Sequence, residues 1–266
     1  MTARTVPPAP APAGHYGFAH AARMEWIKLR SLRSTAWALL LTVAGMIAIG
    51  VVTMANTKVP SADRAAEFDP TNNVLAGVAL GQLVVGVLGV LVVTGEYSSG
   101  SIRSTLAAIP DRRTLLTAKA AVYGALTLLV GEAIALVTFF AGRAALADGV
   151  PRPGIGDPGV LRAVLLSGAY LGLIGLLGIG IGALTRHTAS AIAALVAVTF
   201  VLPAVIGGIS GTTVAKFFPT MIAGNSLAVA KPVSDMLSPW TGFAVLCVYV
   251  AVVLVAGARL LARRDA

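Results

Sequence analysis

Charged residues are scarce in this chain, and their scarcity restricts its fold class. Only 12% of the 266 residues are Asp, Glu, Lys or Arg, whereas 57% are hydrophobic and the mean hydropathy is +0.86. A soluble globular domain carries about 25% charged residues, because it needs them to cover its surface. The composition therefore predicts an integral membrane protein.

Cysteine and nucleotide-binding motifs are also lacking. The single cysteine, Cys247, cannot form an intramolecular disulfide or a cysteine zinc site, and His15, His20 and His187 lack metal-ligand spacing. No glycine is followed directly by lysine, so the chain contains no G-x-x-x-x-G-K-[ST] phosphate-binding loop. We expect no catalytic group, cofactor or metal in this chain.

Aromatic residues make up only 6% of the chain, although its net charge is +9. The basic residues lie singly or in short clusters beside apolar runs, which the positive-inside rule explains. Because no basic surface interleaved with aromatic residues is evident, we expect no nucleic-acid partner.

Six charge-poor windows are long enough for helices that cross a ~30 Å hydrocarbon core. The sequence thus predicts an all-α fold with spans near 36–56, 74–94, 117–140, 162–184, 189–209 and 240–259. Most of the 20 lysines and arginines fall on the side that holds both termini, so we expect both termini in the cytoplasm. Residues 18–261 would form the membrane domain and 262–266 a cytoplasmic tail.

The N-terminal residues 1–17 alternate proline and alanine and lack the apolar core of a cleaved export signal. We expect a disordered cytoplasmic tail there. In the next residues, Phe18, Ala22, Trp26 and Leu29 recur at helical spacing. This pattern predicts an amphipathic helix at the membrane interface.

Small residues follow one face of the fourth predicted span, where Gly168, Gly172, Gly175 and Gly182 recur at helical spacing. Gly77 and Gly81 form a similar pair in the second span. Such residues let helix backbones approach closely in lipid. The stripes indicate either packing within the bundle or a subunit interface.

The connection between spans two and three is unusually structured for a loop. Ile102, Leu106 and Ile109 give one apolar face, and Pro110 would end the helix. The nearby serines Ser98, Ser99 and Ser101 are candidate N-caps. The pattern predicts a short amphipathic helix flat on the membrane surface, with an ordinary cationic loop as the alternative.

Two motifs resemble those of type-2 ABC exporter permeases. Residues 96–106 read EYSSGSIRSTL and are followed by Pro110, Arg112, Arg113 and Lys119; residues 24–34 read MEWIKLRSLRS. The resemblance implies that the loop between spans two and three docks on a separate cytoplasmic ABC ATPase, which would hold ATP and Mg²⁺. It also implies a complex at the cell membrane. Two permease chains, identical or different, would form a dimer there and bind two cytoplasmic ATPase subunits.

The resemblance assigns roles to individual residues. It implies that an ATPase-coupling loop contains Glu96, Tyr97, Gly100, Arg103, Pro110, Arg112 and Arg113. Anchors at the membrane interface would be Trp26, Lys28, Arg30, Arg33 and Lys119.

Glu132 is the one carboxylate within the predicted spans, and Gln82 is a candidate partner for it. A carboxylate in a span indicates a substrate pathway, a proton-linked site or a structural hydrogen bond. Residues 219–230 are too short to span, so we expect a re-entrant or surface helix on the outer face, or an irregular loop.

The function that the resemblance implies is an ATP-driven export permease. A secondary transporter usually has several intramembrane charges or broken helices in matched repeats, which are not evident here. A membrane-embedded enzyme would need catalytic motifs that the sequence lacks. A membrane anchor or assembly factor remains a further alternative.

Overall fold

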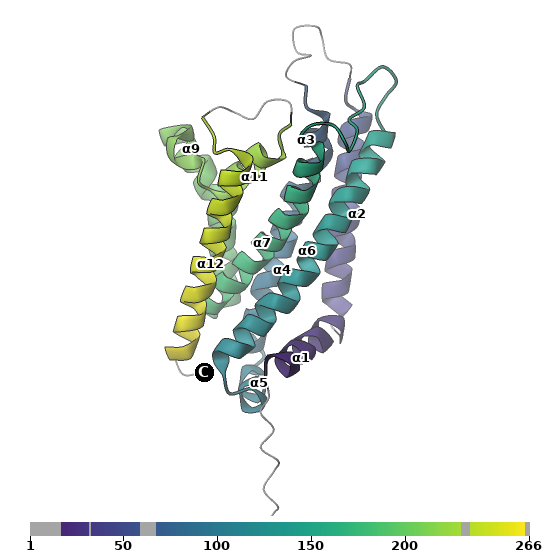
Figure 1. Cartoon of the computed structure of the whole chain (residues 1–266). Coiled ribbons are helices and arrows are strands. Elements are labelled where there is room, and N and C mark those ends of the chain that lie inside the picture. The colour runs from purple at the N-terminus through teal and green to yellow at the C-terminus, as the bar shows by residue number, and fades with distance from the viewer. Residues whose placement is uncertain (1–16, 32, 59–67, 230–234, 264–266) are drawn as a thin grey trace, which may run out of the picture.

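Helices make up the structure, a computed structural model that describes residues 17–31, 33–58, 68–229 and 235–263; no strand occurs within these ranges. Six spans run side by side, and the predicted all-α membrane fold is confirmed (Figure 1). The elements are α1 (Phe18–Ser31), α2 (Arg33–Ala55), α3 (Pro70–Val74), η2 (Leu75–Gly77), α4 (Val78–Ser98), α5 (Ile102–Ala108), α6 (Arg112–Ala144), α7 (Val160–Thr185), α8 (Thr188–Val196), η3 (Ala197–Val201), α9 (Leu202–Ser210), α10 (Thr212–Ala215), α11 (Pro219–Leu227) and α12 (Pro239–Arg263).

The six spans agree closely with the apolar windows of the sequence. They are α2, α3 to α4, α6, α7, α8 to α9, and α12. The largest difference is at α6, which begins at Arg112 instead of residue 117. Its N-terminal turn is polar but still helical, because the Asp111 side chain accepts a hydrogen bond from the Arg113 backbone N–H.

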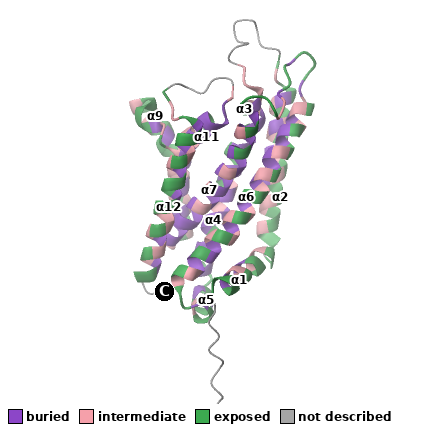
Figure 2. Ribbon diagram, in the orientation of Figure 1, coloured by how far each residue is buried: buried purple, intermediate pink, exposed green. Residues whose placement is uncertain are grey.

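The fourth span, α7, lies at the centre of the bundle. It packs against α4, α6 and α12, and 78% of its apolar window is buried (Figure 2). A Cβ atom at Gly168 would lie 2.5 Å from Cδ of Glu132 on α6, and one at Gly178 would lie 2.2 Å from the Gly86 carbonyl oxygen on α4. The glycine stripe of α7 therefore serves packing within the bundle.

We expect Gly178→Ala to destabilise the protein by about 1–3 kcal/mol, because the added methyl group would force α4 and α7 apart. Gly208→Ala in α9 is the matched control, since a Cβ atom there would have no heavy atom within 4 Å. The midpoints of thermal unfolding in detergent measure the stability of both variants. Equal midpoints for the two variants would contradict the close α4–α7 crossing.

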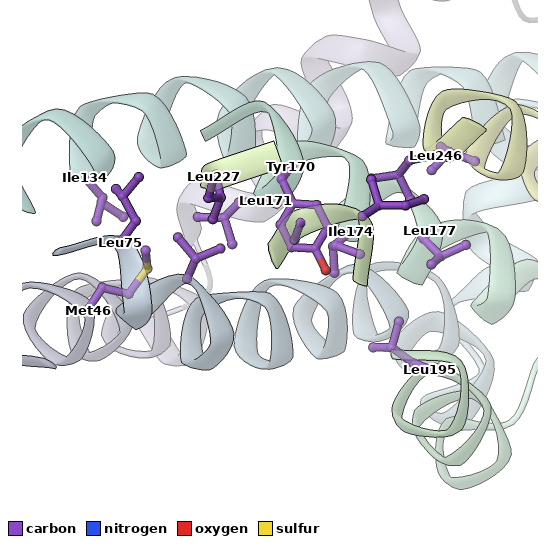
Figure 3. Close-up of a cluster of buried hydrophobic side chains, with 14 of the residues drawn as sticks. Met46, Leu75, Ile134, Tyr170, Leu171, Ile174, Leu177, Leu195, Leu227 and Leu246 are labelled. Carbon is purple, nitrogen blue, oxygen red and sulfur yellow. The ribbon is translucent and has the colours of Figure 1, made fainter. Parts of the chain in front are cut away.

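The largest apolar core joins several spans around α7 (Figure 3). Its buried members include Met46 of α2, Leu75 of η2, Leu195 of α8 and Leu246 of α12, which meet the α7 side chains Tyr170, Leu171, Ile174 and Leu177. The side chains that form this core come from distant parts of the chain, so it fixes how the spans are arranged.

The fifth span is present where the sequence predicted it, near 189–209, but it is not α-helical throughout. A π-helical turn, η3, separates α8 from α9. Pro203 has no N–H to donate to the carbonyl group four residues earlier, on Thr199. The Thr220 hydroxyl of α11 donates a hydrogen bond to that carbonyl group instead.

The connector before the last span contains α10 and α11. Helix α11 has nine residues, too few to cross a bilayer. It packs on α12 and α7, and its residues Ile222 and Leu227 join the main core. The sequence left open whether this connector holds a short helix or an irregular loop. For residues 219–227 the short helix is correct and the irregular loop is wrong.

Two terminal predictions lie mostly outside the described residues. The expected disordered tail, residues 1–17, overlaps the structure only at Gly17. Of the expected C-terminal tail, residues 262 and 263 belong to α12, and residues 264–266 lie outside the described range.

Candidate functional site

Helix α5 is a short helix at the end of the bundle that also carries α1 and the C-terminal end of α12, hereafter the α5 end (Figure 1). Helix α4 ends at Ser98, and Gly100 has a φ of +71°, a left-handed conformation that favours glycine. Of the predicted serine caps, Ser101 is at the N-cap position of α5 but makes no side-chain capping bond. Ser98 and Ser99 do not cap α5, because their hydroxyls donate back to the Gly95 carbonyl oxygen of α4.

The apolar side of α5 faces the protein. Ile102 and Ile109 are buried in a small core with Ala21 of α1 and with Leu115 and Ala118 of α6. The predicted apolar face of the helix is thus present and contacts protein, whereas its position flat on the membrane surface stays a prediction. The face packs on α1 and α6 because these helices offer apolar surface at that level.

The opposite side of α5 and the residues that follow it are exposed. Arg103, Ser104, Pro110 and Arg113 are all solvent-accessible. Arg112 differs from its neighbours because its guanidinium donates a hydrogen bond of 3.0 Å to the Leu261 carbonyl oxygen near the end of α12. Of the predicted coupling residues, Arg103, Pro110 and Arg113 therefore face outward, whereas Arg112 ties α6 to α12.

A cluster of four charged residues lies next to α5, on the side of that helix that faces the protein. Glu25 and Lys28 come from α1, Glu96 from α4 and Lys119 from α6; these four residues are the ion-pair cluster. Lys119 Nζ lies 2.9 Å from Glu25 Oε2 and 2.7 Å from Glu96 Oε1. Lys28 Nζ lies 3.1 Å from Glu25 Oε1 and 2.6 Å from Glu96 Oε1. The four side chains form a closed ring of alternating charge.

The ion-pair cluster also holds α5. Lys28 Nζ donates a hydrogen bond of 3.2 Å to the Thr105 hydroxyl oxygen, and Thr105 is buried. Helices α1, α4, α5 and α6 are thereby joined through side chains at one point. A displacement of α5 cannot leave this network unchanged, because Lys28 bonds α1, α4 and α5 together.

Most of the ion-pair cluster is buried. The side chains of Lys119 and Glu25 are only 3% and 4% exposed, whereas that of Lys28 is 35% exposed. Buried charges are tolerated where each has partners of opposite sign and hydrogen bonds. Burial by itself would lower the pKa of Lys28, but the hydrogen bond to Glu96 and the charges of Glu25 and Glu96 outweigh it. The pKa of Lys28 is therefore raised, and its amine stays protonated.

The structure corrects one of the predicted interface anchors, because Lys119 is too deeply buried to reach lipid headgroups. Lys28 bonds to the carboxylates of the ion-pair cluster but is 35% exposed, so its contact with the interface stays a prediction. Trp26, Arg30 and Arg33 are exposed, which leaves their predicted contact with the interface open. The carboxylates of Glu25 on α1 and Glu96 on α4 explain where the two lysine amines lie, because they are stronger partners for a lysine than water is.

Tyr97, one of the predicted coupling residues, is half-buried and lies beside the side chain of Arg186. The guanidinium carbon of Arg186, which follows α7, lies 5.3 Å from the centre of the Tyr97 ring, within the range of a cation–π contact. The Arg186 backbone is left-handed, with a φ of 61°. Its side chain also approaches the Leu260 carbonyl oxygen, at 3.5 Å. Tyr97 thus connects the end of α4 to the α7–α8 turn.

The N-terminus of α6 is capped by Asp111, whose carboxylate accepts hydrogen bonds from the Thr114 hydroxyl and the Arg113 backbone N–H. The Thr114 hydrogen bond is the main reason that the pKa of Asp111 is lowered, since it stabilises the charged carboxylate. This cap fixes where the α5–α6 connection ends.

The two candidate pathway residues do not meet. Gln82 Oε1 accepts a hydrogen bond of 2.5 Å from the Tyr170 hydroxyl, both residues being buried. Glu132 lies against Gly168 of α7, and its Oε2 atom is buried with no hydrogen-bond partner among the described residues. The predicted pairing of Gln82 with Glu132 is therefore wrong, and a role for either in a substrate pathway stays a prediction.

Glu25, Thr105 and Arg186 were not singled out from the sequence as coupling residues. A signal for Glu25 exists in the 24–34 motif, because Glu25 precedes Lys28 by three residues, a spacing at which opposite charges pair on a helix. No group of three or more His, Cys, Asp or Glu side chains in the described ranges could hold a metal ion. Comparison of the sequence with known protein families and with curated proteins finds no match.

Proposed function

We propose that this chain is the membrane subunit of an ATP-driven exporter of the type-2 ABC permease kind. It moves its substrate across the cell membrane by alternating access. A separate ATPase subunit binds and hydrolyses ATP with Mg²⁺, and two permease chains, identical or different, assemble with two ATPase subunits. The chain itself carries out no covalent chemistry.

The observation that carries this proposal is the two-sided character of α5. Its outer side exposes Arg103 and Ser104, whereas its inner side is fixed by Ile102, Ile109 and the Thr105–Lys28 hydrogen bond. A docking element that transmits force needs both features: an accessible contact surface and a firm connection to the helices that move. An ordinary loop needs neither.

The ion-pair cluster offers a route for that force. A push on α5 acts through Thr105 on Lys28, and Lys28 is bonded to Glu25 of α1 and Glu96 of α4. Lys119 extends the connection to α6. Movement of the partner ATPase would thus reach three of the helices that pass into or along the membrane. Two discrete arrangements of such a network would suit a two-state transporter.

In this proposal the α5 end faces the cytoplasm, where ATP is available. Lysines and arginines concentrate at this end, as expected for the inner side of a membrane. The beginning of α1 and the end of α12 lie at the same end (Figure 1). Both chain termini would then be cytoplasmic.

The direct test is co-purification of the tagged chain from native membranes in mild detergent. The proposal predicts that a soluble subunit with a Walker A motif is retained and that the eluate hydrolyses ATP. Recovery of the chain without any ATP-hydrolysing subunit, at conditions that preserve its fold, would contradict it. The partner's surface should carry an acidic residue opposite Arg103, which is the basic residue exposed on α5.

A further inference from the structure

A pocket of about 680 Å³ lies between α1, α2 and α4 at the α5 end. This volume falls within the range of small-molecule sites, ~300–1,000 Å³. The pocket has an apolar wall and a polar end. Its apolar wall is formed by Leu29, Ala38, Leu88, Leu91 and Val92, and its polar end by Glu25, Lys28, Ser31, Ser34, Thr35, Glu96, Ser99 and Ser101.

The pocket crosses the boundary between the apolar spans and the polar end of the bundle. Ser34 and Thr35 immediately precede the apolar run of α2, and Leu88 and Leu91 belong to the apolar part of α4. Glu96 lies one turn further along α4. In a bilayer this is the level at which lipid headgroups meet acyl chains. An amphipathic lipid matches such a pocket better than a wholly polar solute does.

The polar end is balanced in charge but has one unsatisfied acceptor. Lys28 and Lys119 offset Glu25 and Glu96, so the pocket has no excess of positive charge to select an anionic headgroup. Glu96 is 8% exposed, and its Oε2 atom is buried without a hydrogen-bond partner in the described part of the chain. A buried carboxylate oxygen without a donor is costly. A donor that enters beside Glu96 would complete its hydrogen bonding.

We propose that this pocket binds a membrane phospholipid whose headgroup carries a primary ammonium group. The ammonium group donates to the Glu96 carboxylate, and the phosphate lies near the Lys28 amine and the hydroxyls of Ser34 and Thr35. The acyl chains follow the apolar wall formed by Leu88 and Leu91 into the bilayer. A quaternary ammonium headgroup has no N–H to donate, so it cannot satisfy Glu96. This site does not depend on the proposed ATPase partner.

The test is native mass spectrometry of the purified chain with phosphatidylethanolamine, phosphatidylcholine and phosphatidylglycerol of identical acyl chains. We expect phosphatidylethanolamine to bind at least about tenfold more tightly than phosphatidylcholine, because hydrogen bonds to a charged group account for at least that factor. In Glu96→Gln this preference should fall to near unity. Equal binding of the two lipids by the wild type, or tighter binding of phosphatidylglycerol, would overturn the proposal.

A pair of tryptophan variants tests the location of the site. Leu91→Trp fills the apolar wall and should abolish the selective binding. Leu129→Trp is the matched control, because Leu129 is 70% exposed on α6 and does not line the pocket. Thermal unfolding checks that each variant is folded. If Glu96→Gln does not fold, the two tryptophan variants alone test whether the lipid binds in this pocket. Selective binding that persists in Leu91→Trp would place the lipid elsewhere and overturn the proposal.

Discussion

Lys119→Met is expected to destabilise the folded chain by about 3–5 kcal/mol. The substitution removes a cation that is 3% exposed and lies within 3 Å of two carboxylates, Glu25 and Glu96. Lys28 alone would then face both carboxylates, which leaves an uncompensated negative charge at a buried site. Thermal or denaturant unfolding of the detergent-solubilised protein measures the loss.

Two further variants distinguish the effect of disrupting the ion-pair cluster from the general effect of removing a lysine. Lys58→Met removes an exposed lysine and should change stability by no more than about 0.5 kcal/mol. In Lys119→Met combined with Glu25→Gln, one positive and one negative charge remain, so much of the stability should return. A Lys119→Met protein as stable as the wild type would show that the ion-pair cluster does not hold α1, α4 and α6 together.

Arg103→Glu is expected to abolish retention of the proposed ATPase subunit while leaving the chain folded. Arg103 is exposed on the outer side of α5, so its replacement disturbs no buried contact. Against an acidic partner surface, however, reversal of its charge places like charges together, which costs several kcal/mol and lowers affinity by well over ~10-fold. Quantitative co-purification of the ATPase with the tagged variant measures the effect.

The matched control is Arg263→Glu, which reverses the charge of an exposed arginine in the last turn of α12. It changes the net charge by the same amount but does not touch α5. Loss of the ATPase from both variants would mean that net charge, and not α5, governs assembly. Full retention of the ATPase by Arg103→Glu would remove α5 from the interface.

The spans could be predicted because the signal for them is local. An apolar run of about 20 residues must cross a bilayer or be buried, whatever the rest of the chain does. The spacing of Ile102, Leu106 and Ile109 similarly predicted α5, since helical periodicity is also local. What the apolar side of α5 packs against was not predictable, because Ala21 and Leu115 are brought there by the tertiary fold.

The ion-pair cluster illustrates the same limit more sharply. Lys119 is separated from Glu25 by 94 residues, and Lys28 from Glu96 by 68. The motif resemblance singled out Glu96 as a coupling residue and assigned Lys28 and Lys119 to the membrane interface. Only the three-dimensional arrangement of α1, α4 and α6 shows that these residues pair with one another. The contact of the π-helical turn with α11 was likewise not predictable, because the tertiary fold brings the Thr220 hydroxyl to the Thr199 carbonyl group.

Site-specific photo-cross-linking from α5 tests whether this helix contacts an ATPase subunit. A photoreactive amino acid at Ser104, exposed on the outer side of α5, is compared in native membranes with one at Leu129, exposed in the middle of α6. We expect position 104 to cross-link to a soluble subunit with a Walker A motif and position 129 not to do so. Cross-links from position 104 only to lipid, or to proteins without an ATP site, would contradict the role of α5 as the docking element of an ATP-driven exporter.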